Sequence, residues 1–294
     1  MNMDNFIKKI TVLIKEQLGS NYDIRIETIR KNNDTELHGF VILRNDRQEK
    51  VTPTIYLEEF FQAYRDGIPL ANIVQRIIDV YDTHHKELDF DVSTILNFNA
   101  IRNQISFHLI NTERNTQLIQ GIPHLQYLDF SIIFRINIES QAIGHGSITI
   151  KNDLLKSWGI CVDELYQIAL QNTPRLMPCS IKNISQVIDE LHGGSGIDLI
   201  PMYVITNDRK ERGCGCILYP DVIENFANVI RSDLYLLPSS IHEMIAIPVS
   251  YGNVYELKSI VHEVNCTQVS KEDFLSDNVY RYYRDTNRIE IITS

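Results

Sequence analysis

The segment from Leu199 to Pro248 constrains the fold of this chain more than any other stretch of its sequence. Short apolar runs follow one another there and are separated by Gly, Pro, Asn and Ser, a pattern typical of buried strands joined by tight turns. The pattern predicts, in order, a strand over Leu199–Thr206, a charged hairpin loop over Asn207–Arg212, a strand over Gly213–Tyr219, a helix over Pro220–Ile230, a strand over Asp233–Leu237, one helical turn over Pro238–Glu243 and a strand over Met244–Val249. We therefore expect a sheet here, against which the other segments pack.

The flanking segments alternate between helical and strand periodicity. Apolar residues at helical spacing predict helices over Asn5–Leu18, Asp91–Phe98, Asn152–Ser157, Val162–Gln171, Ile184–Leu191 and Val254–Val264, and two tightly joined helices within Ile55–Tyr81. Alternating or continuous apolar runs predict strands over Tyr22–Arg30, Leu37–Arg44, Glu49–Thr52, Ile101–Ile110, Leu125–Ile138 and His145–Ile150, and a closing hairpin of Val279–Tyr283 with Ile289–Thr293. This order predicts an α+β fold of mixed, largely antiparallel sheets with packed amphipathic helices.

The weakest junction in the pattern lies near Asn111–Gly121. It predicts two tightly associated regions. Residues 1–115 form an N-terminal region of a helix, a β-hairpin and a helix pair, and residues 116–294 form a C-terminal mixed α/β region that ends in the closing hairpin.

Composition limits the class of partner and the compartment. The net charge of −10, from 38 acidic and 28 basic residues, argues against a broad phosphate-binding face and therefore against nucleic acid as a partner. The first residues lack the apolar core of a secretion signal, and no stretch approaches the roughly 18–20 apolar residues of a membrane span. Five cysteines without a regular spacing are typical of reduced thiols, so we expect a cytoplasmic protein with no membrane partner.

Six separated motifs carry a resemblance to a known family. They are Pro53–Glu58, Leu109–Asn111, Pro123-His124 with Leu128-Asp129, Trp158–Ile160, Asn172–Pro174 and Leu237–Glu243. In this order, over nearly the whole chain, they resemble an uncharacterised domain-of-unknown-function family of Gram-positive anaerobic bacteria. The resemblance implies a bacterial cytosolic setting and no assigned activity, cofactor or catalytic residue.

The segment Ser239-Ser240-Ile241-His242-Glu243 contains the candidate catalytic residues. Ser, His and Glu are the parts of a nucleophile, base and orienting group, which must be hydrogen-bonded in series. Ser240 followed by Glu243 is also a capping box, which stabilises a helix start by about 0.5–2 kcal/mol. Pro238 and Ile241 stand where a catalytic serine usually has glycine neighbours, so the cap is the favoured interpretation and no catalytic residue is assigned.

Two further motifs resemble ligand sites without meeting their requirements. Cys214 and Cys216 are one residue apart, whereas closed zinc sites use a wider spacing and a second pair of ligands. The loop His192–Gly196 is glycine-rich but lacks the Lys-Ser/Thr and the following helix of a phosphate-binding loop. We therefore expect small core thiols, a linker, and neither a metal nor a cofactor.

The C-terminal strand is the candidate partner-binding surface. Tyr280, Arg281, Tyr282 and Arg284 interleave the residue types that are favoured at binding hot spots and on stacking surfaces. Alternation places Tyr280, Tyr282 and Arg284 on one face, which we expect to be presented to solvent or to a partner. The alternative interpretation is an edge strand half-buried on the core, which β propensity favours.

No motif in the sequence assigns a reaction. The absence of a metal set, a phosphate loop or a complete triad favours a non-catalytic cytosolic interaction or regulatory protein with a protein partner. An inhibitor or accessory protein encoded by a mobile element is one version of that class. The alternatives are a hydrolase that uses Ser240 or Ser239 with His242, and nucleic-acid binding through the C-terminal Tyr/Arg strand.

Overall fold

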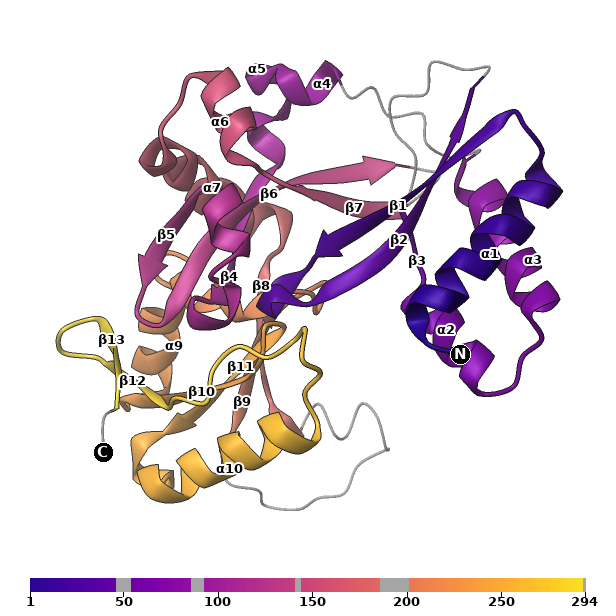
Figure 1. Cartoon of the computed structure of the whole chain (residues 1–294). Coiled ribbons are helices and arrows are strands. Elements are labelled where there is room, and N and C mark those ends of the chain that lie inside the picture. The colour runs from indigo at the N-terminus through magenta and orange to yellow at the C-terminus, as the bar shows by residue number, and fades with distance from the viewer. Residues whose placement is uncertain (46–53, 86–92, 141–143, 186–200, 293–294) are drawn as a thin grey trace. The chain divides into compact units, whose positions relative to one another are not determined.

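The computed structural model describes residues 1–45, 54–85, 93–140, 144–185 and 201–292, which group into two compact units (Figure 1). Unit 1 comprises Met1–Lys31, Thr35–Phe98 and Ile138–Gly146, and unit 2 comprises Asn32–Asp34, Asn99–Asn137 and Ser147–Ser294. Helices and three largely antiparallel sheets confirm the predicted α+β class. The predicted division between residues 115 and 116 stays a prediction, because grouping by contacts does not test which segments fold alone.

Unit 1 packs helices against a three-stranded sheet of order β1-β2-β3. Its elements are α1 (Met3–Leu18), β1 (Tyr22–Arg30), β2 (Glu36–Arg44), β3 (Thr54–Tyr56), α2 (Glu58–Arg65), α3 (Leu70–His85) and α4 (Ser93–Leu96). α1 begins where the side chain of Asn2 accepts from the Asn5 N–H, and it ends at Gly19, whose φ of 82° suits glycine. α1 and α3 lie side by side (Figure 1), and their stripes meet the sheet in a core that includes Phe6, Phe40 and Ile77. The predicted helix, hairpin and helix pair are confirmed.

Unit 2 contains the other two sheets. The four-stranded sheet has the order β4-β6-β5, with β7 paired to β6, and the six-stranded sheet has the order β13-β12-β10-β11-β9-β8. The strands are β4 (Ile105–Asn111), β5 (His124–Tyr127), β6 (Phe130–Ser140), β7 (Gly144–Thr149), β8 (Cys179–Asn183), β9 (Tyr203–Asn207), β10 (Leu234–Ser240), β11 (Glu243–Pro248), β12 (Tyr280–Tyr283) and β13 (Arg288–Ile291). The last residues of β6 and the first of β7 group with unit 1.

Helices cover these sheets. They are α5 (Phe98–Ile101), α6 (Asn152–Trp158), α7 (Val162–Leu176), α9 (Val222–Ile230) and α10 (Val254–Thr267). α7 packs on β4, where the Thr173 hydroxyl accepts from the Phe107 N–H at 3.1 Å, and α10 packs along β10 (Figure 1). No helix in the described part of the chain combines the length and apolarity that crossing a membrane requires.

The predicted strand over Gly213–Tyr219 is wrong. These residues form a 3₁₀ helix, η5 (Gly213–Leu218), so β9 has no hairpin partner after it. Gly213 lies so close to β9 that an added Cβ would stand 2.3 Å from Thr206 Oγ1. β9 pairs instead with β8 and β11, and β8 is a five-residue strand that the sequence analysis did not predict.

The predicted helical turn over Pro238–Glu243 is also wrong. β10 continues to Ser240, β11 begins at Glu243, and the two strands pair as an antiparallel hairpin with a bulge between Pro238 and Ser240. The Ser240 hydroxyl accepts from the His242 N–H at 3.0 Å, so it caps a tight turn between strands instead of a helix. The capping-box pattern failed because the apolar runs on both sides pair with each other.

The predicted strand over Leu125–Ile138 is two strands. β5 and β6 form a hairpin whose loop is Leu128-Asp129, and Leu128 has a φ of 54°. An apolar residue at positive φ gives no turn signal, which explains the missed break. The predicted strand over Glu49–Thr52, most of the helix over Ile184–Leu191 and the glycine-rich loop over His192–Gly196 lie outside the described residues.

Candidate functional site

The imidazole of His242 is held through both ring nitrogens. Nδ1 accepts from the Arg212 backbone N–H at 3.1 Å, and Nε2 lies 3.1 Å from Asp273 Oδ1. Because the backbone N–H can only donate, Nδ1 carries the lone pair and Nε2 donates its proton to Asp273.

Neither ring nitrogen of His242 is then directed at a serine. The Ser240 hydroxyl binds the main chain of His242, and Glu243 begins β11. The side chain of His242 therefore connects the turn between β10 and β11 to the loop of Arg212 and to the loop of Asp273, and the Ser240 hydroxyl stabilises that turn. This geometry supports the structural interpretation over a nucleophile–base pair for Ser239, Ser240, His242 and Glu243.

The thiols of Cys214 and Cys216 are buried on η5. Cys216 Sγ donates to the Thr206 carbonyl oxygen at 3.2 Å, and burial raises the pKa of Cys214 to about 12. A metal ion needs the thiolate, which this burial disfavours. Among the described residues, no group of three or more His, Cys, Asp or Glu side chains is arranged to hold a metal.

Tyr280 and Tyr282 of β12 are buried, which corrects the expectation that they face solvent. Tyr280 is 1% exposed and Tyr282 is 2% exposed. Their face of β12 is covered: the Tyr280 ring packs on Phe130 with centroids 5.1 Å apart, and the Tyr282 hydroxyl bonds Asn287, whereas Arg281 and Tyr283 on the opposite face are half-buried.

The arginines of the candidate surface are bonded to unit 2 itself. Arg281 Nη2 pairs with Asp233 Oδ2 at 2.7 Å, and the Arg284 guanidinium donates to Asn228 Oδ1 at 3.2–3.3 Å. The four predicted residues therefore form no common exposed face. Only Tyr282 lines the cleft described next.

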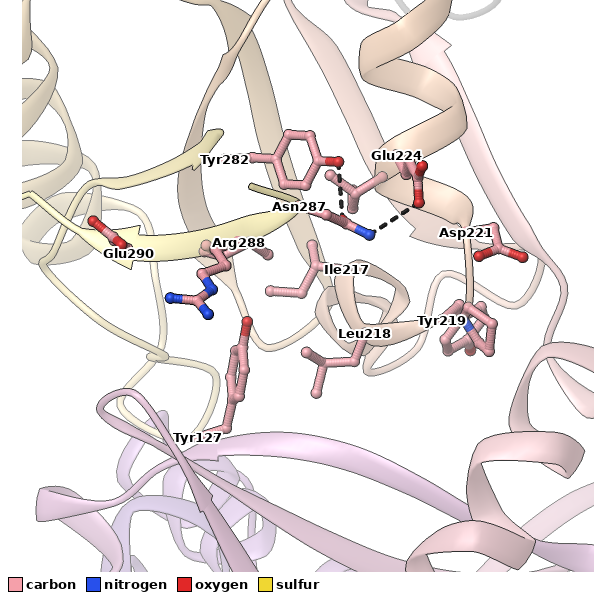
Figure 2. A pocket seen from close by; sticks show the side chains of 13 residues that line it. Tyr127, Ile217, Leu218, Tyr219, Asp221, Glu224, Tyr282, Asn287, Arg288 and Glu290 are labelled. Atoms are coloured by element: carbon pink, nitrogen blue, oxygen red, sulfur yellow. Dashed lines mark hydrogen bonds between the residues drawn. The ribbon is translucent and has the colours of Figure 1, made fainter. Parts of the chain in front are cut away.

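A cavity of about 610 Å³ opens in unit 2 beside the β12–β13 hairpin (Figure 2). We call it the tyrosine-lined cleft. Its lining comprises Tyr127, Ile217, Leu218, Tyr219, Pro220, Asp221, Ile223, Glu224, Tyr282, Asn287, Arg288, Ile289 and Glu290. The volume lies within the range of about 300–1,000 Å³ that ligand pockets occupy. η5 and α9 form one side, the hairpin forms the other, and Tyr127 enters from the end of β5.

Asn287 fixes the two sides of the cleft to each other. Its Oδ1 accepts from the Tyr282 hydroxyl at 3.0 Å, and its Nδ2 donates to Glu224 Oε2 at 2.9 Å (Figure 2). Asn287 has a φ of 50° and Asp221 has a φ of 61°. Asn and Asp tolerate this left-handed region better than other non-glycine residues, so both rims are turns that the sequence supports.

The cleft combines an apolar floor with an acidic rim. Ile217, Ile223 and Tyr282 are buried, whereas Asp221, Arg288 and Glu290 are exposed. With Glu224, the lining carries three carboxylates and one guanidinium. Burial, and then the neighbouring Tyr166, raises the pKa of Tyr127 to about 12, so its hydroxyl stays neutral near pH 7. The described residues that line the cleft include no Ser, Cys or His.

β13 presents its backbone at the edge of the sheet. The Ile292 N–H donates to the Val279 carbonyl oxygen at 2.9 Å, in the same register that pairs Glu290 with Arg281. Since alternate residues of an antiparallel strand bond the same neighbour, the N–H and C=O of Ile289 point away from β12. Ile289 lines the cleft, and among the described strands none pairs with the outer edge of β13, so this edge lies at the cleft.

Sequence reasoning did not identify this cleft. Its residues come from four separated segments, and none of them forms a recognised motif. The available signals were the polar turn Asp285–Asn287 and the Pro220-Asp221 helix start, both of which predict local structure only.

A family model described as a family of unknown function (DUF5688) matches residues 3–284. No curated protein and no solved structure matches the chain. The match confirms the resemblance to a family without an assigned activity.

Proposed function

Because the chain belongs to this family of unknown function, we propose a role from its own geometry: it is a non-catalytic binding protein that takes an extended, basic segment of a protein partner into the tyrosine-lined cleft. The observation that carries the proposal is the edge of β13 along the cleft. Main-chain hydrogen bonds to such an edge supply affinity, and pockets for alternate side chains supply specificity.

The charge of the cleft selects the class of partner. Asp221, Glu224 and Glu290 outnumber the single Arg288, and the whole chain carries a net charge of −10. An acidic rim attracts lysine and arginine side chains and raises the rate of encounter with a basic segment. The same charge repels phosphate groups, so it supports a protein partner over nucleic acid.

The setting that we propose is the bacterial cytosol, with a regulatory role. All five cysteines are free, as in most cytosolic proteins, and the hydrogen bonds of His242 support binding over hydrolysis. A protein that acts by occupying a partner's extended segment is suited to an inhibitor or accessory role, including one encoded by a mobile element.

A substitution at Ile289 tests the proposal. Ile289→Pro removes the outward N–H but no hydrogen bond to β12, and Ile289→Ala shortens the side chain while keeping the N–H. The probe is a fluorescein-labelled ten-residue peptide of alternating Lys and Val, with a Glu–Val peptide for comparison. We expect the wild type to prefer the Lys–Val peptide and Ile289→Pro to weaken binding about tenfold relative to Ile289→Ala, as the loss of one or two hydrogen bonds predicts.

Two variants that each replace a carboxylate by a neutral amide test the role of charge. Asp221→Asn keeps a residue that tolerates positive φ and removes one rim charge, whereas Asp153→Asn removes an exposed charge on α6. Fluorescence anisotropy should show weaker Lys–Val binding for the first variant alone. Equal binding of both peptides, or equal affinities for Ile289→Pro and Ile289→Ala, would contradict the proposal.

A further inference from the structure

A second cavity of unit 2, with a volume of about 670 Å³, carries charges of both signs. We call it the Asp129 cavity. Its lining comes from Asn111–Arg114 at the end of β4, from Asp129 in the β5–β6 loop, and from Phe274 and Ser276–Asn278 before β12. None of the described residues that line it also lines the tyrosine-lined cleft, so the two sites are separate.

The carboxylate of Asp129 is fixed by neutral donors. Its Oδ2 accepts from the Ser276 hydroxyl at 2.7 Å and from Asn278 Nδ2 at 3.0 Å, and its Oδ1 accepts from the Tyr280 hydroxyl at 2.5 Å. Burial, followed by the charge of Asp129, raises the pKa of Tyr280, so this hydroxyl keeps its proton. A carboxylate has about four acceptor positions, so Asp129 can accept one more hydrogen bond. Among the described side chains, no cation pairs with it.

The guanidinium of Arg114 is stacked on an aromatic ring. Its Cζ lies 3.3 Å from the centroid of Phe274, which is only 6% exposed and therefore a fixed support. The Arg114 backbone is fixed as well, because its N–H donates to Asn111 Oδ1 at 2.7 Å. Stacking occupies a face of the guanidinium and leaves the N–H groups at its edge able to bind an anion. In the part of the chain that the structure describes, no carboxylate pairs with this guanidinium.

We propose that the Asp129 cavity binds a free amino acid, with the ligand's ammonium group at Asp129 and its carboxylate at Arg114. The two protein charges line one cavity without pairing, so they are too far apart for a direct ion pair. A charge that is partly withdrawn from water is costly without a counter-charge. A zwitterion supplies both counter-charges at once. This site does not depend on the proposed binding of a partner segment.

The other charges of the cavity disfavour ligands with a single charge. Glu113, Asp129 and Asp277 outnumber Arg114, so a simple anion is repelled. A simple cation would leave the Arg114 guanidinium without an anion. Glu113 and Asp277 are exposed, and Asp277 already accepts from Asn265 Nδ2 at 2.8 Å, whereas Asp129 is half-buried. Asp129 is therefore the carboxylate that gains most from an ammonium group.

Calorimetry with matched ligands tests the proposal. A thermal-shift screen of the full chain with each common L-amino acid and with γ-aminobutyrate selects the best binder. Isothermal titration calorimetry then compares it with its two single-charge analogues, which for L-alanine are propionate and ethylamine. We expect the amino acid to bind about tenfold or more tightly than either analogue, because each analogue lacks one charged hydrogen-bonded pair. The absence of binding by any amino acid, or equal binding of the amino acid and one analogue, would overturn the proposal.

Variants assign the two ends of the ligand. Arg114→Gln should weaken binding of the amino acid about tenfold or more, to about the affinity of the amine analogue. Arg76→Gln is the matched control and should bind as the wild type does, because Arg76 is an exposed arginine over the ring of Phe60, at 5.7 Å, outside the cavity. Equal affinities for Arg114→Gln and Arg76→Gln would overturn the proposal.

Asp129→Asn tests the ammonium end. It should weaken binding of the amino acid about tenfold or more without weakening that of the carboxylate analogue. Loss of binding to both ligands in a folded variant would contradict the assigned orientation. Circular dichroism checks the fold, because the substitution alters the hydrogen bonds of Ser276, Asn278 and Tyr280. If Asp129→Asn does not fold, the comparison of Arg114→Gln with Arg76→Gln decides alone.

Discussion

At the scale of single residues, unit 2 depends on a buried asparagine. Asn115 is fully buried, its Oδ1 accepts from the Asn33 N–H at 2.7 Å, and its Nδ2 donates to Asn33 Oδ1 at 3.0 Å and to the Asn111 carbonyl oxygen at 2.7 Å. Asn33 itself has a φ of 57° and donates to the carbonyl oxygen of Phe274 at 2.8 Å. Each group has a partner, so the network fixes one arrangement of these loops.

Asn115→Ala should therefore be strongly destabilising. It leaves the Asn33 N–H and two buried oxygens without partners, and each such group costs about 1–3 kcal/mol. We expect the free energy of unfolding, measured with urea, to fall by about 3 kcal/mol or more. Asn225→Ala, an exposed change on α9, should alter it by less than about 0.5 kcal/mol. Similar losses for the two variants would show that the network contributes little.

A second residue-scale prediction concerns pH. His108 is 4% exposed on β4, and burial, followed by the positive charges of Arg135 and Arg212, holds its pKa well below 6.5. Below about pH 6.5 the unfolded chain binds a proton at this site that the folded chain does not. The sign of the linkage is then that this term reduces stability as the pH falls below 6.5 and vanishes above it.

His108→Gln should remove this dependence. Between pH 7 and pH 5, we expect the wild type to lose up to about 1.4 kcal/mol per pH unit more than the variant does. Urea unfolding at several pH values measures the difference in slope. His262→Gln, on an exposed histidine, is the control and should keep the wild-type slope. Parallel slopes for wild type and His108→Gln would mean that the folded chain binds a proton at His108 as readily as the unfolded chain does.

At the scale of elements, the β12–β13 hairpin is tied to α9 through Asn287. The side-chain bonds to Tyr282 and Glu224 are its polar link across the tyrosine-lined cleft (Figure 2). Asn287→Gly keeps the positive φ without strain and removes both bonds, so it isolates the link from the turn.

We expect Asn287→Gly to loosen β13 locally. Hydrogen exchange at the Arg288 and Glu290 amides, which face β12, should accelerate about tenfold, while global stability falls by only about 1 kcal/mol because the link is exposed. Asp285→Ala, in the same turn, is the matched control and should leave both amides near their wild-type rates. Unchanged exchange in Asn287→Gly would show that pairing with β12 alone holds the edge strand in place.

The failed element predictions have a common physical cause. The apolar run of Gly213–Tyr219 and the capping box of Ser240 and Glu243 are both compatible with more than one local structure. The choice depends on partners far along the chain. Gly213 packs against Thr206 and the carbonyl of His242, and the strand ends at Ser240 and Glu243 pair with each other.

At the scale of the whole molecule, the sequence by itself determined the elements that have a strong, regular period. The stripe of Phe6, Ile10 and Ile14 places α1 on its core, and the alternation of β1 and β2 predicts their hairpin. Burial in these elements follows local spacing, so a local pattern is sufficient to predict it. The α+β class and the closing hairpin were predicted on the same grounds.

Only the tertiary structure decided where polar groups and edges lie. The β12 face that carries Tyr280 and Tyr282 is buried because other segments of unit 2 cover it, and both ring nitrogens of His242 have partners because Arg212 and Asp273 reach them. The tyrosine-lined cleft likewise draws on segments around residues 127, 220 and 288. These features depend on contacts between residues tens of positions apart, and no short-range period in the sequence records such contacts.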